Sequence, residues 1–362
     1  MSRTFSDPWT PRLVRLFTPF ADLWETGVRS SSTRQNARTY LLGLLLPGER
    51  KSMEPMAERL PQTTVDRIQN FLTDSPWEAD LVQTRLLEVM GHRFAAPSGC
   101  LSIDDTSFPK QGRASVGVGR QWCGALGKNT NCQVGVSLYY VRPETRRHAD
   151  LIGFSGGIRL YLPQSWADSL PRREKARVPP SMEFAEKWRI ALALVDRVRR
   201  LRIPHRAVLA DADYGRSGEF RAALRKRGEA YAVGVQAHSL AVMPLSGSAA
   251  DDRGPPIGAR RLAAELPRSA WRSLRWGTGT KGPLVMELAR VRVEVCHQDP
   301  HHADHPMIPS GERAWLVFER RSNETKAYLL WRLDDLSLRR QAQIIRTRWP
   351  IEQGYQQMKE EL

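Results

Sequence analysis

Cys100-Leu101-Ser102-Ile103-Asp104-Asp105 places two carboxylates at the end of a short apolar run. A second apolar run, 207–210, ends in the same way at Asp211. Runs of this length and composition are typical of buried strands. A carboxylate at the end of such a strand reaches the rim of the sheet, so the two runs predict a sheet whose rim carries acidic side chains.

A third acidic position, Glu352, lies in Arg348-Trp349-Pro350-Ile351-Glu352, with Lys359 beyond it. Proline disfavours helical geometry at the preceding residue and suits the first helical position, so a helix is expected to begin at Pro350. Glu352 would lie in its first turn, where the helix dipole favours an ionised carboxylate, with Lys359 two turns on along the same face, placed to meet a phosphate. Taken alone, this helix fits an ordinary solvated face better than a functional site. Together, the acidic positions predict hard oxygen ligands for two Mg²⁺ or Mn²⁺ ions.

Length and charge limit the possible functions. The 362 residues are enough for roughly two to three domains. Lys and Arg number 55 against 39 Asp and Glu, a net charge of +16. Arginine, which suits bidentate phosphate contact, dominates the excess. We therefore expect a polyanionic partner such as nucleic acid, rather than a basic protein that is merely soluble.

Other features argue against a membrane or secreted protein. The longest apolar run, 40–46, is too short to span a bilayer, and residues 1–7 lack the pattern of a signal peptide. The four cysteines have no CxxC spacing, which argues against a disulfide framework or a standard zinc module. Cys296-His297 and the histidines at 301, 302 and 305 fit a solvated loop better than a zinc site. We expect a soluble, cytoplasmic, nucleoid-associated protein.

The first part of the chain, 1–95, is expected to be helical. Thr10-Pro11 is a candidate helix start, followed by an amphipathic run from 13 to 24 and shorter helices over 39–46, 50–60 and 63–72. Short basic helices joined by tight turns suit a helix-turn-helix-like DNA contact, and a helical cap on the core is the alternative. Periodicity leaves both open.

From Ser98 the pattern becomes strand-like. Strands are expected over 100–105, 132–141, 207–211 and 231–235, with a helix over 183–200 capped by Ser181 and another over 217–227 ended by Gly228. Hairpins followed by alternation of strands and helices indicate a mixed α/β sheet. The glycines between 112 and 127 fit a hairpin beside the first aspartates rather than a phosphate-binding loop, because no GxGxxG or GxxxxGK[ST] pattern is present.

The following segment predicts a β-rich insertion. Polar, Pro- and Gly-rich loops are expected at 245–258 and 298–312, with a strand over 285–295 between them. After the second loop, two strands over 314–318 and 326–333 are expected to form a hairpin around Ser322-Asn323. The expected domains are a helical DNA-binding domain over 1–95, the first part of the catalytic core over 96–240, the insertion over 241–333, and a core helix segment over 334–362.

A family resemblance follows from the spacing Arg348-x3-Glu352-x6-Lys359, which fits the arginine-glutamate-lysine signature of cut-and-paste insertion-sequence transposases. Further matching stretches are Thr39 to Lys51, Ile103 to Gly112, Gly119 to Gly124, Arg159 to Pro163, Ala210 to Gly215 and Tyr231 to Val235. The chain resembles DDE-type transposases, which are DDE superfamily endonucleases with a ribonuclease H-like core.

The resemblance implies a set of site residues. The first catalytic aspartate is Asp105 or Asp104, the second is Asp211 and the third acid is Glu352, and together they hold two Mg²⁺ or Mn²⁺ ions. Asp105 is preferred because related enzymes place this aspartate directly before a hydroxyl residue, here Thr106, although strand alternation also permits Asp104.

The resemblance also implies the DNA contacts. Arg348 and Lys359 match the phosphate-contacting pair of the family, and Lys110 and Arg120 lie in matching stretches and are expected to contact DNA. The tyrosine expected three residues before the arginine is Ile345 here.

The activity implied is metal-dependent cleavage at element ends and strand transfer into target DNA. The partners would be double-stranded DNA of the terminal inverted repeats and of the target, and a homodimer is one expected assembly. Family members usually continue past the signature lysine, whereas this sequence stops at Leu362. A catalytically impaired remnant that binds DNA is therefore the alternative, and a structure-selective nuclease of the same fold is a further one.

Overall fold

The computed structural model of the 362-residue chain divides into two compact units, Met1–Arg93 with Gly354–Leu362, and Phe94–Gln353. It describes residues 30–48, 50–60, 62–142, 152–247, 252–279, 282–297, 307–321, 324–348 and 350–360. The predicted helix over 13–24, its start at Thr10-Pro11, the turn at Ser322-Asn323 and the histidines at 301–305 lie outside these residues.

The described part of the first unit is helical. Its helices are α2 (Ser31–Leu45), α3 (Met53–Arg59), α4 (Val65–Thr73) and α5 (Ala79–Phe94). The Thr64 hydroxyl accepts a hydrogen bond from the backbone N–H of Arg67 and so caps α4, while the side chains of Met56 and Phe71 are fully buried. The expected role of this unit in DNA contact stays a prediction.

The second unit is built on a mixed sheet. The strands of its core are β1 (Cys100–Pro109), β2 (Gly119–Cys123), β3 (Lys128–Arg142), β4 (Ile152–Leu160), β5 (Ala207–Ala210) and β6 (Tyr231–Val235). β3 runs antiparallel to β4 and β1, whereas β1, β5 and β6 run parallel, giving the order β4-β3-β1-β5-β6. The predicted mixed α/β fold is confirmed.

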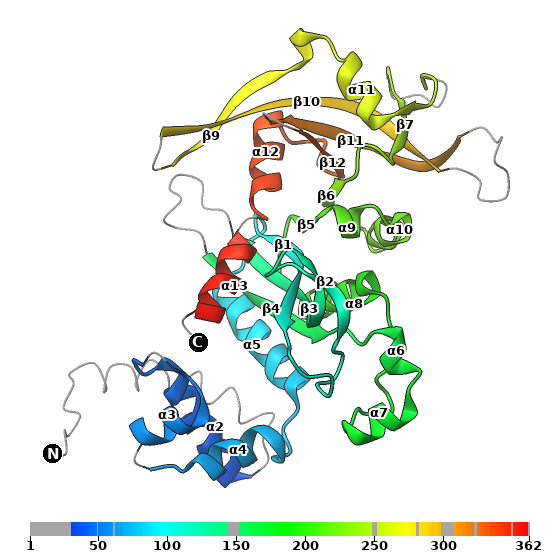
Figure 1. Cartoon of the computed structure of the whole chain (residues 1–362). Helices are drawn as coiled ribbons and strands as arrows, with labels where there is room; N and C mark the ends of the chain where they lie inside the picture. Colours follow the sequence, from blue (N-terminus) through cyan, green and yellow to red (C-terminus); the bar gives the residue numbers. More distant parts are fainter. Residues whose placement is uncertain are drawn as a thin grey trace. The chain divides into compact units, whose positions relative to one another are not determined.

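The remaining strands extend the same sheet. They are β7 (Ala241–Pro244), β8 (Ile257–Gly258), β9 (Arg272–Gly279), β10 (Gly282–His297), β11 (Ile308–Arg320) and β12 (Thr325–Trp331). β12 pairs antiparallel with β6, and the long strands β9 to β11 form a curved ribbon, yellow to brown in Figure 1. The end of the predicted loop at 298–312 was placed too late, because the chain already pairs with β10 from Ile308 onward.

The helices of this unit are α6 (Gln164–Ala167), α7 (Leu170–Lys175), α8 (Lys187–Arg200), α9 (Ala212–Gly215), α10 (Gly218–Lys226), α11 (Ala259–Glu265) and α12 (Leu338–Arg346), with a 3₁₀ turn over Arg268–Ala270. α13 (Pro350–Glu360) begins at Pro350 as predicted. Ser217 caps α10, and Gly228 adopts a left-handed conformation (φ 74°) just after it, so both ends of this helix agree with the prediction.

The predicted cap of α8 is wrong. The helix begins at Lys187, after Glu186, and Ser181 lies well before it in an irregular segment. The Arg173 guanidinium holds this segment by donating hydrogen bonds to the backbone carbonyl groups of Pro179, Pro180 and Met182. These carbonyl contacts hold 179–182 in place outside the helix.

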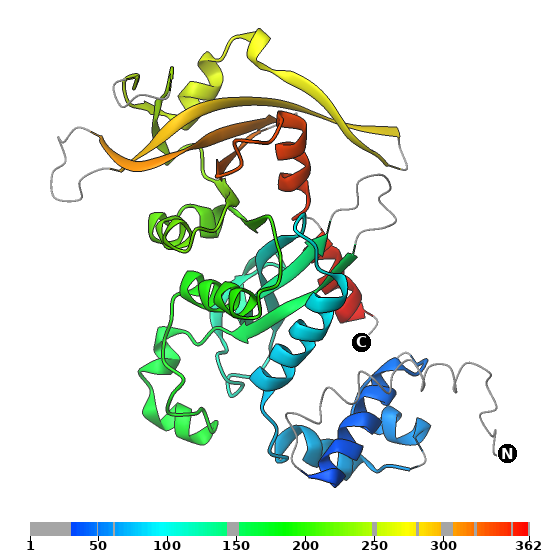
Figure 2. The same ribbon diagram turned by 180° about the vertical axis from the view of Figure 1, so that it is seen from behind.

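The two faces of the core sheet are covered by different helices. α8 packs on β3 and β4, on the face turned toward the viewer in Figure 2. On the other face Cys100, Ala207 and Leu209 share a buried apolar cluster with Ile344 and Ile345 of α12. Side chains of alternate residues in β1 and β5 therefore point either toward α8 or toward α12. None of the helices in the described part of the chain is long and apolar enough to cross a membrane.

Candidate active site

Asp104 and Asp211 project from the same face of the sheet. In the parallel pair β1 and β5, Cys100 lies beside Ala207 and Ser102 beside Leu209. Two residues further on come Asp104, still in β1, and Asp211, the residue directly after the end of β5. Side chains two residues apart share a face, so both aspartates lie on the α12 side, with Cys100, Ala207 and Leu209.

Arg348 joins this face to the third acidic residue. It lies two residues after the end of α12, and one guanidinium nitrogen, Nη1, donates to Asp104 Oδ2 at 2.8 Å. The other, Nη2, donates to Glu352 Oε1 at 3.1 Å, one turn along the chain. The Glu352 side chain is 54% exposed, whereas that of Asp104 is 16% exposed. A single cation therefore links the first and third predicted acidic positions.

Asp105 points to the opposite face. Its Oδ2 accepts a bond of 2.6 Å from Lys187 Nζ at the start of α8, and its Oδ1 accepts one of 2.5 Å from the hydroxyl group of Tyr214 in α9. The carboxylate of Asp105 is therefore neutralised from the α8 side. Sequence reasoning assigned no role to Lys187, which has no local signal, or to Tyr214, which lies in the matching stretch 210–215.

Asp211 is fixed by the helix that follows it. It is the N-cap of α9, and its Oδ1 accepts hydrogen bonds from the backbone N–H groups of Asp213 (3.0 Å) and Tyr214 (3.2 Å). At the other end of α9, the buried Arg221 guanidinium donates to the Gly215 carbonyl oxygen at 2.5 Å and to Glu312 Oε1 of β11 at 2.8 Å. Strand β11 thus holds the short helix that orients Asp211.

The electrostatics of this face favour a cation. The pKa of Asp104 is raised to about 7, first by burial and then by the charges of Asp211 and Asp105, despite the opposing effect of Arg348. The pKa of Asp211 is also raised, first by burial and then by Asp213 and Asp105, while Arg348 lowers it. One arginine therefore only partly compensates the two buried carboxylates.

The donor chemistry fits a divalent cation such as Mg²⁺ or Mn²⁺, since each of the three acidic residues offers hard carboxylate oxygens. In the described residues, no three Asp, Glu, His or Cys side chains are grouped closely enough to form a preassembled metal site. The guanidinium group of Arg348 holds Asp104 and Glu352 in this arrangement, so a cation bound by all three acids would have to displace it from one of them.

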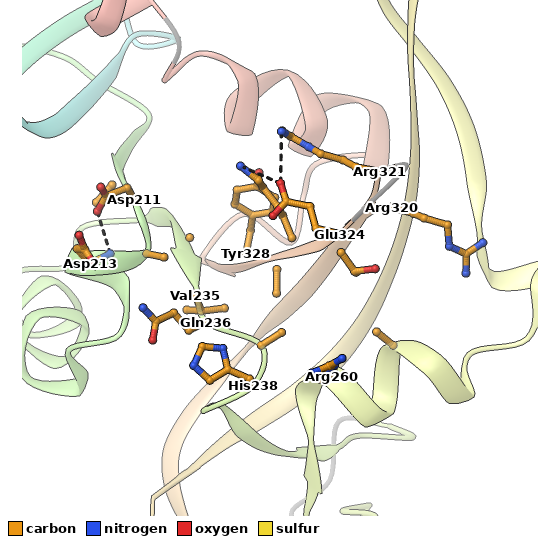
Figure 3. Close-up of a pocket in the computed structure, with 18 of the residues that line it drawn as sticks. Asp211, Asp213, Val235, Gln236, His238, Arg260, Arg320, Arg321, Glu324 and Tyr328 are labelled. Carbon is orange, nitrogen blue, oxygen red and sulfur yellow. Dashed lines mark hydrogen bonds and ion pairs between the residues drawn. The ribbon is translucent and has the colours of Figure 1, made fainter. Parts of the chain in front are cut away.

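A cavity of about 920 Å³ adjoins this face and includes both Asp211 and Arg348 in its wall. Figure 3 shows Asp211 at one end and Arg260, Arg320 and Arg321 toward the other. Lys326 also lines it. Arg320 is stacked 3.8 Å over the Trp271 ring and Arg321 is paired with Glu319, whereas the Arg260 side chain has no ion pair or hydrogen bond with the described residues. The cavity is thus predominantly cationic beyond the acidic end.

The other predicted DNA contacts are Lys110, Arg120 and Lys359. Lys110 follows the end of β1, and Arg120 lies on β2, both exposed. Lys359 belongs to the last turn of α13, and its side chain lies outside the described part of the structure. The structure therefore brings together Asp104, Asp211, Arg348 and Glu352.

Comparison with known proteins gives two similarities. The family model described as DDE superfamily endonuclease matches residues 24–283, a range that contains Asp104, Asp105 and Asp211 and ends before Arg348 and Glu352. A curated protein of Microchaete diplosiphon, named as a probable transposase for insertion sequence element IS701, is 27% identical over 205 residues. This match covers 56% of the chain and 49% of the relative, so the chain spans about half the length of the curated relative that it matches.

Proposed function

The chain belongs to the DDE superfamily endonucleases, and we propose from this membership that it is an insertion-sequence transposase that cuts DNA at the element's ends and joins them to target DNA. The observation that carries the proposal is the Arg348 guanidinium group between Asp104 and Glu352, on the face that Asp211 shares. We propose that the two aspartates and the arginine-glutamate pair of the family's signature come together here, at one end of the sheet.

The carboxylate set that we propose is Asp104, Asp211 and Glu352. Asp104 is the better first ligand because it shares a face with Asp211 and Arg348, whereas the carboxylate of Asp105 is bound by Lys187 and Tyr214 on the other face. Asp105, the residue favoured by its position before Thr106, remains the competing candidate.

Superfamily members generally use divalent metals, and the three carboxylates would hold Mg²⁺ or Mn²⁺ here, with two ions proposed. Such ions activate water as a nucleophile and stabilise the charge on the leaving oxygen of a phosphodiester. The protein's own part is to orient the ligands: α9 fixes Asp211, and Arg348 positions Asp104 and Glu352 until DNA arrives. The guanidinium group would then be free to contact a phosphate.

The path of the DNA is proposed to follow the cationic cavity. Arg260, Arg320 and Lys326 line it beyond Asp211, and phosphate contacts from such side chains give affinity without sequence preference. Lys110, Arg120 and Lys359 are proposed as further contacts. Double-stranded DNA of the element ends and of the target would be the substrates, and a homodimer is the proposed assembly.

The test is nicking and strand transfer of end-containing DNA in Mg²⁺ or Mn²⁺ by the wild type and by Glu352→Ala. Metal-dependent nicking that is lost in Glu352→Ala supports a transposase. Binding without nicking by the wild type would instead support a DNA-binding remnant, and nicking of branched DNA without strand transfer would support a structure-selective nuclease.

A further inference from the structure

The segment that follows the two aspartates of β1 carries basic side chains and no acidic ones. Residues 106–142 contain no Asp or Glu, in a chain that has 39 of them. The basic residues of this segment are Lys110, Arg113, Arg120, Lys128 and Arg142. Among the described residues, no carboxylate forms an ion pair with Lys110, Arg113, Arg120 or Lys128. The hairpin of β2 and β3 therefore presents uncompensated positive charge.

The hairpin is firmly anchored on its inner side. Cys123 and Cys132 are fully buried in a small apolar cluster with Val134. Gln121 Nε2 donates to the Cys132 carbonyl oxygen at 2.9 Å, and Asn131 Nδ2 donates to the carbonyl oxygens of Lys110 and Gly112 at 2.7 and 2.8 Å. These contacts fix which side chains of β2 point inward.

Strand alternation then directs Arg120 and Trp122 outward. Gln121 and Cys123 occupy the inner positions, so the intervening Trp122 is 58% exposed, and Leu126 in the turn is 50% exposed. Among the described residues, the Trp122 ring has no stacking, cation–π or hydrogen-bond partner. An anchored strand thus holds an uncovered indole near an unpaired arginine.

The distance to the proposed active site is set by β3. Asp104 lies opposite Ser137, and Trp122 lies opposite Asn129, eight residues along the same strand. At about 3.3 Å per residue this is roughly 26 Å along the strand. Successive nucleotides of duplex DNA are about 3.4 Å apart, so a duplex at the aspartates would have Trp122 within roughly eight base pairs of the scissile phosphate.

We propose that Trp122 is a stacking platform for a base of the DNA near the cut, with Arg120 contacting a neighbouring phosphate. Bases stack on exposed aromatic rings irrespective of sequence, and arginine supplements such platforms. A second copy of this chain would bring its own net charge of +16 to an already basic surface, whereas DNA is complementary to it. The inference rests on the proposed DNA substrate.

The experiment measures binding of the full chain to a plain duplex and to the same duplex carrying a run of unpaired bases. We expect unpaired bases to strengthen wild-type binding. Trp122→Ala should weaken binding to that probe by about 5- to 100-fold and remove the preference for it, while Trp122→Phe should keep most of both. Leu126→Ala, equally exposed in the turn, is the matched control and should bind like the wild type.

Salt dependence separates stacking from charge. Arg120→Ala should lower the slope of log K against log salt by about one, whereas Trp122→Ala should leave the slope unchanged. The inference would be overturned if Trp122→Ala bound the probe with unpaired bases as tightly as the wild type does. It would also be overturned if Trp122→Ala changed only the oligomeric state. Either result would leave the proposed function standing. Failure of the wild type to bind either probe would overturn both.

Discussion

Asp104 on β1 and Asp211, the residue directly after the parallel strand β5, each lie two residues beyond the Ser102–Leu209 pair. Their shared face leads to the first prediction. Asp104→Ala and Asp211→Ala should each lower metal-dependent nicking by at least about 10³-fold, because each removes a metal ligand, while DNA affinity stays within a few-fold of the wild type. Single-turnover nicking and gel-shift assays measure the two quantities.

Asp105→Ala is the control for this prediction. Its side chain lies on the α8 face, bound by Lys187 and Tyr214, so more nicking should survive than in Asp104→Ala. The reverse order, with nicking retained in Asp104→Ala and lost in Asp105→Ala, would assign the first ligand to Asp105.

The second prediction concerns pH. The folded-state pKa of Asp104 is about 7, above the unfolded value of about 3.9, so the native state holds a proton that the unfolded state releases between these values. This group therefore lowers the free energy of unfolding as pH rises from about 4 to 7. Relative to Asp104→Asn, the metal-free wild type should lose thermal stability between pH 5 and pH 8.

Divalent cations should reverse this loss. A cation binds the ionised carboxylate, so Mn²⁺ should raise the Tm of the wild type more at pH 8 than at pH 5, where a proton must first be displaced. Asp104→Asn should respond less at both. If the Tm of the wild type and that of Asp104→Asn change with pH in the same way, both with and without Mn²⁺, then Asp104 is not the titrating group.

The third prediction concerns the cavity. Arg260→Ala should weaken DNA binding and lower the salt slope by about one, because the Arg260 side chain lines the cavity without a protein partner. Its neighbour Arg261 is also exposed but already paired with Glu265, so Arg261→Ala is the matched control and should have a smaller effect. Salt titration of binding distinguishes the two, and equal losses would place the DNA elsewhere.

The fourth prediction concerns the buried ion pair that supports α9. Glu312→Ala should lower the free energy of unfolding by about 3–5 kcal/mol, because it leaves the buried Arg221 guanidinium without its carboxylate partner. Chemical denaturation measures this loss. The exposed pair of Arg261 and Glu265 is the comparison, and breaking it should leave the free energy of unfolding almost unchanged. A Glu312→Ala protein as stable as the wild type would contradict the proposed support of α9.

Local patterns were enough to predict some of these features. The apolar runs before Asp104 and Asp211 are strands, and Pro350 begins a helix, because each depends on neighbours in the sequence. The prediction missed α12, and with it the cluster of Cys100 with Ile344 that brings Arg348 to the sheet. That placement depends on contacts far apart in sequence, which periodicity does not encode.

The choice between the two adjacent aspartates illustrates the same limit. Alternation in β1 places Asp104 and Asp105 on opposite faces, but the sequence does not reveal which helix covers which face. The Asp105 partner Lys187 is 82 residues away, in helix α8. The start of α8 was predicted too early, because Arg173 binds the backbone carbonyl groups of the segment before it and keeps that segment out of the helix. Cap residues alone could not reveal this.

The hydrogen bond between Arg348 and Asp104 joins residues 244 positions apart. At a synthesis rate of about 5–20 residues per second, the ribosome makes the arginine roughly 12–50 s after the aspartate. Once Asp211 has been made, β1 and β5 can form while the face carrying Asp104 and Asp211 still lacks the Arg348 guanidinium group. A nascent polypeptide would thus hold two uncompensated carboxylates but no assembled centre, and nuclease activity would begin only once residues 348–352 have been translated and folded.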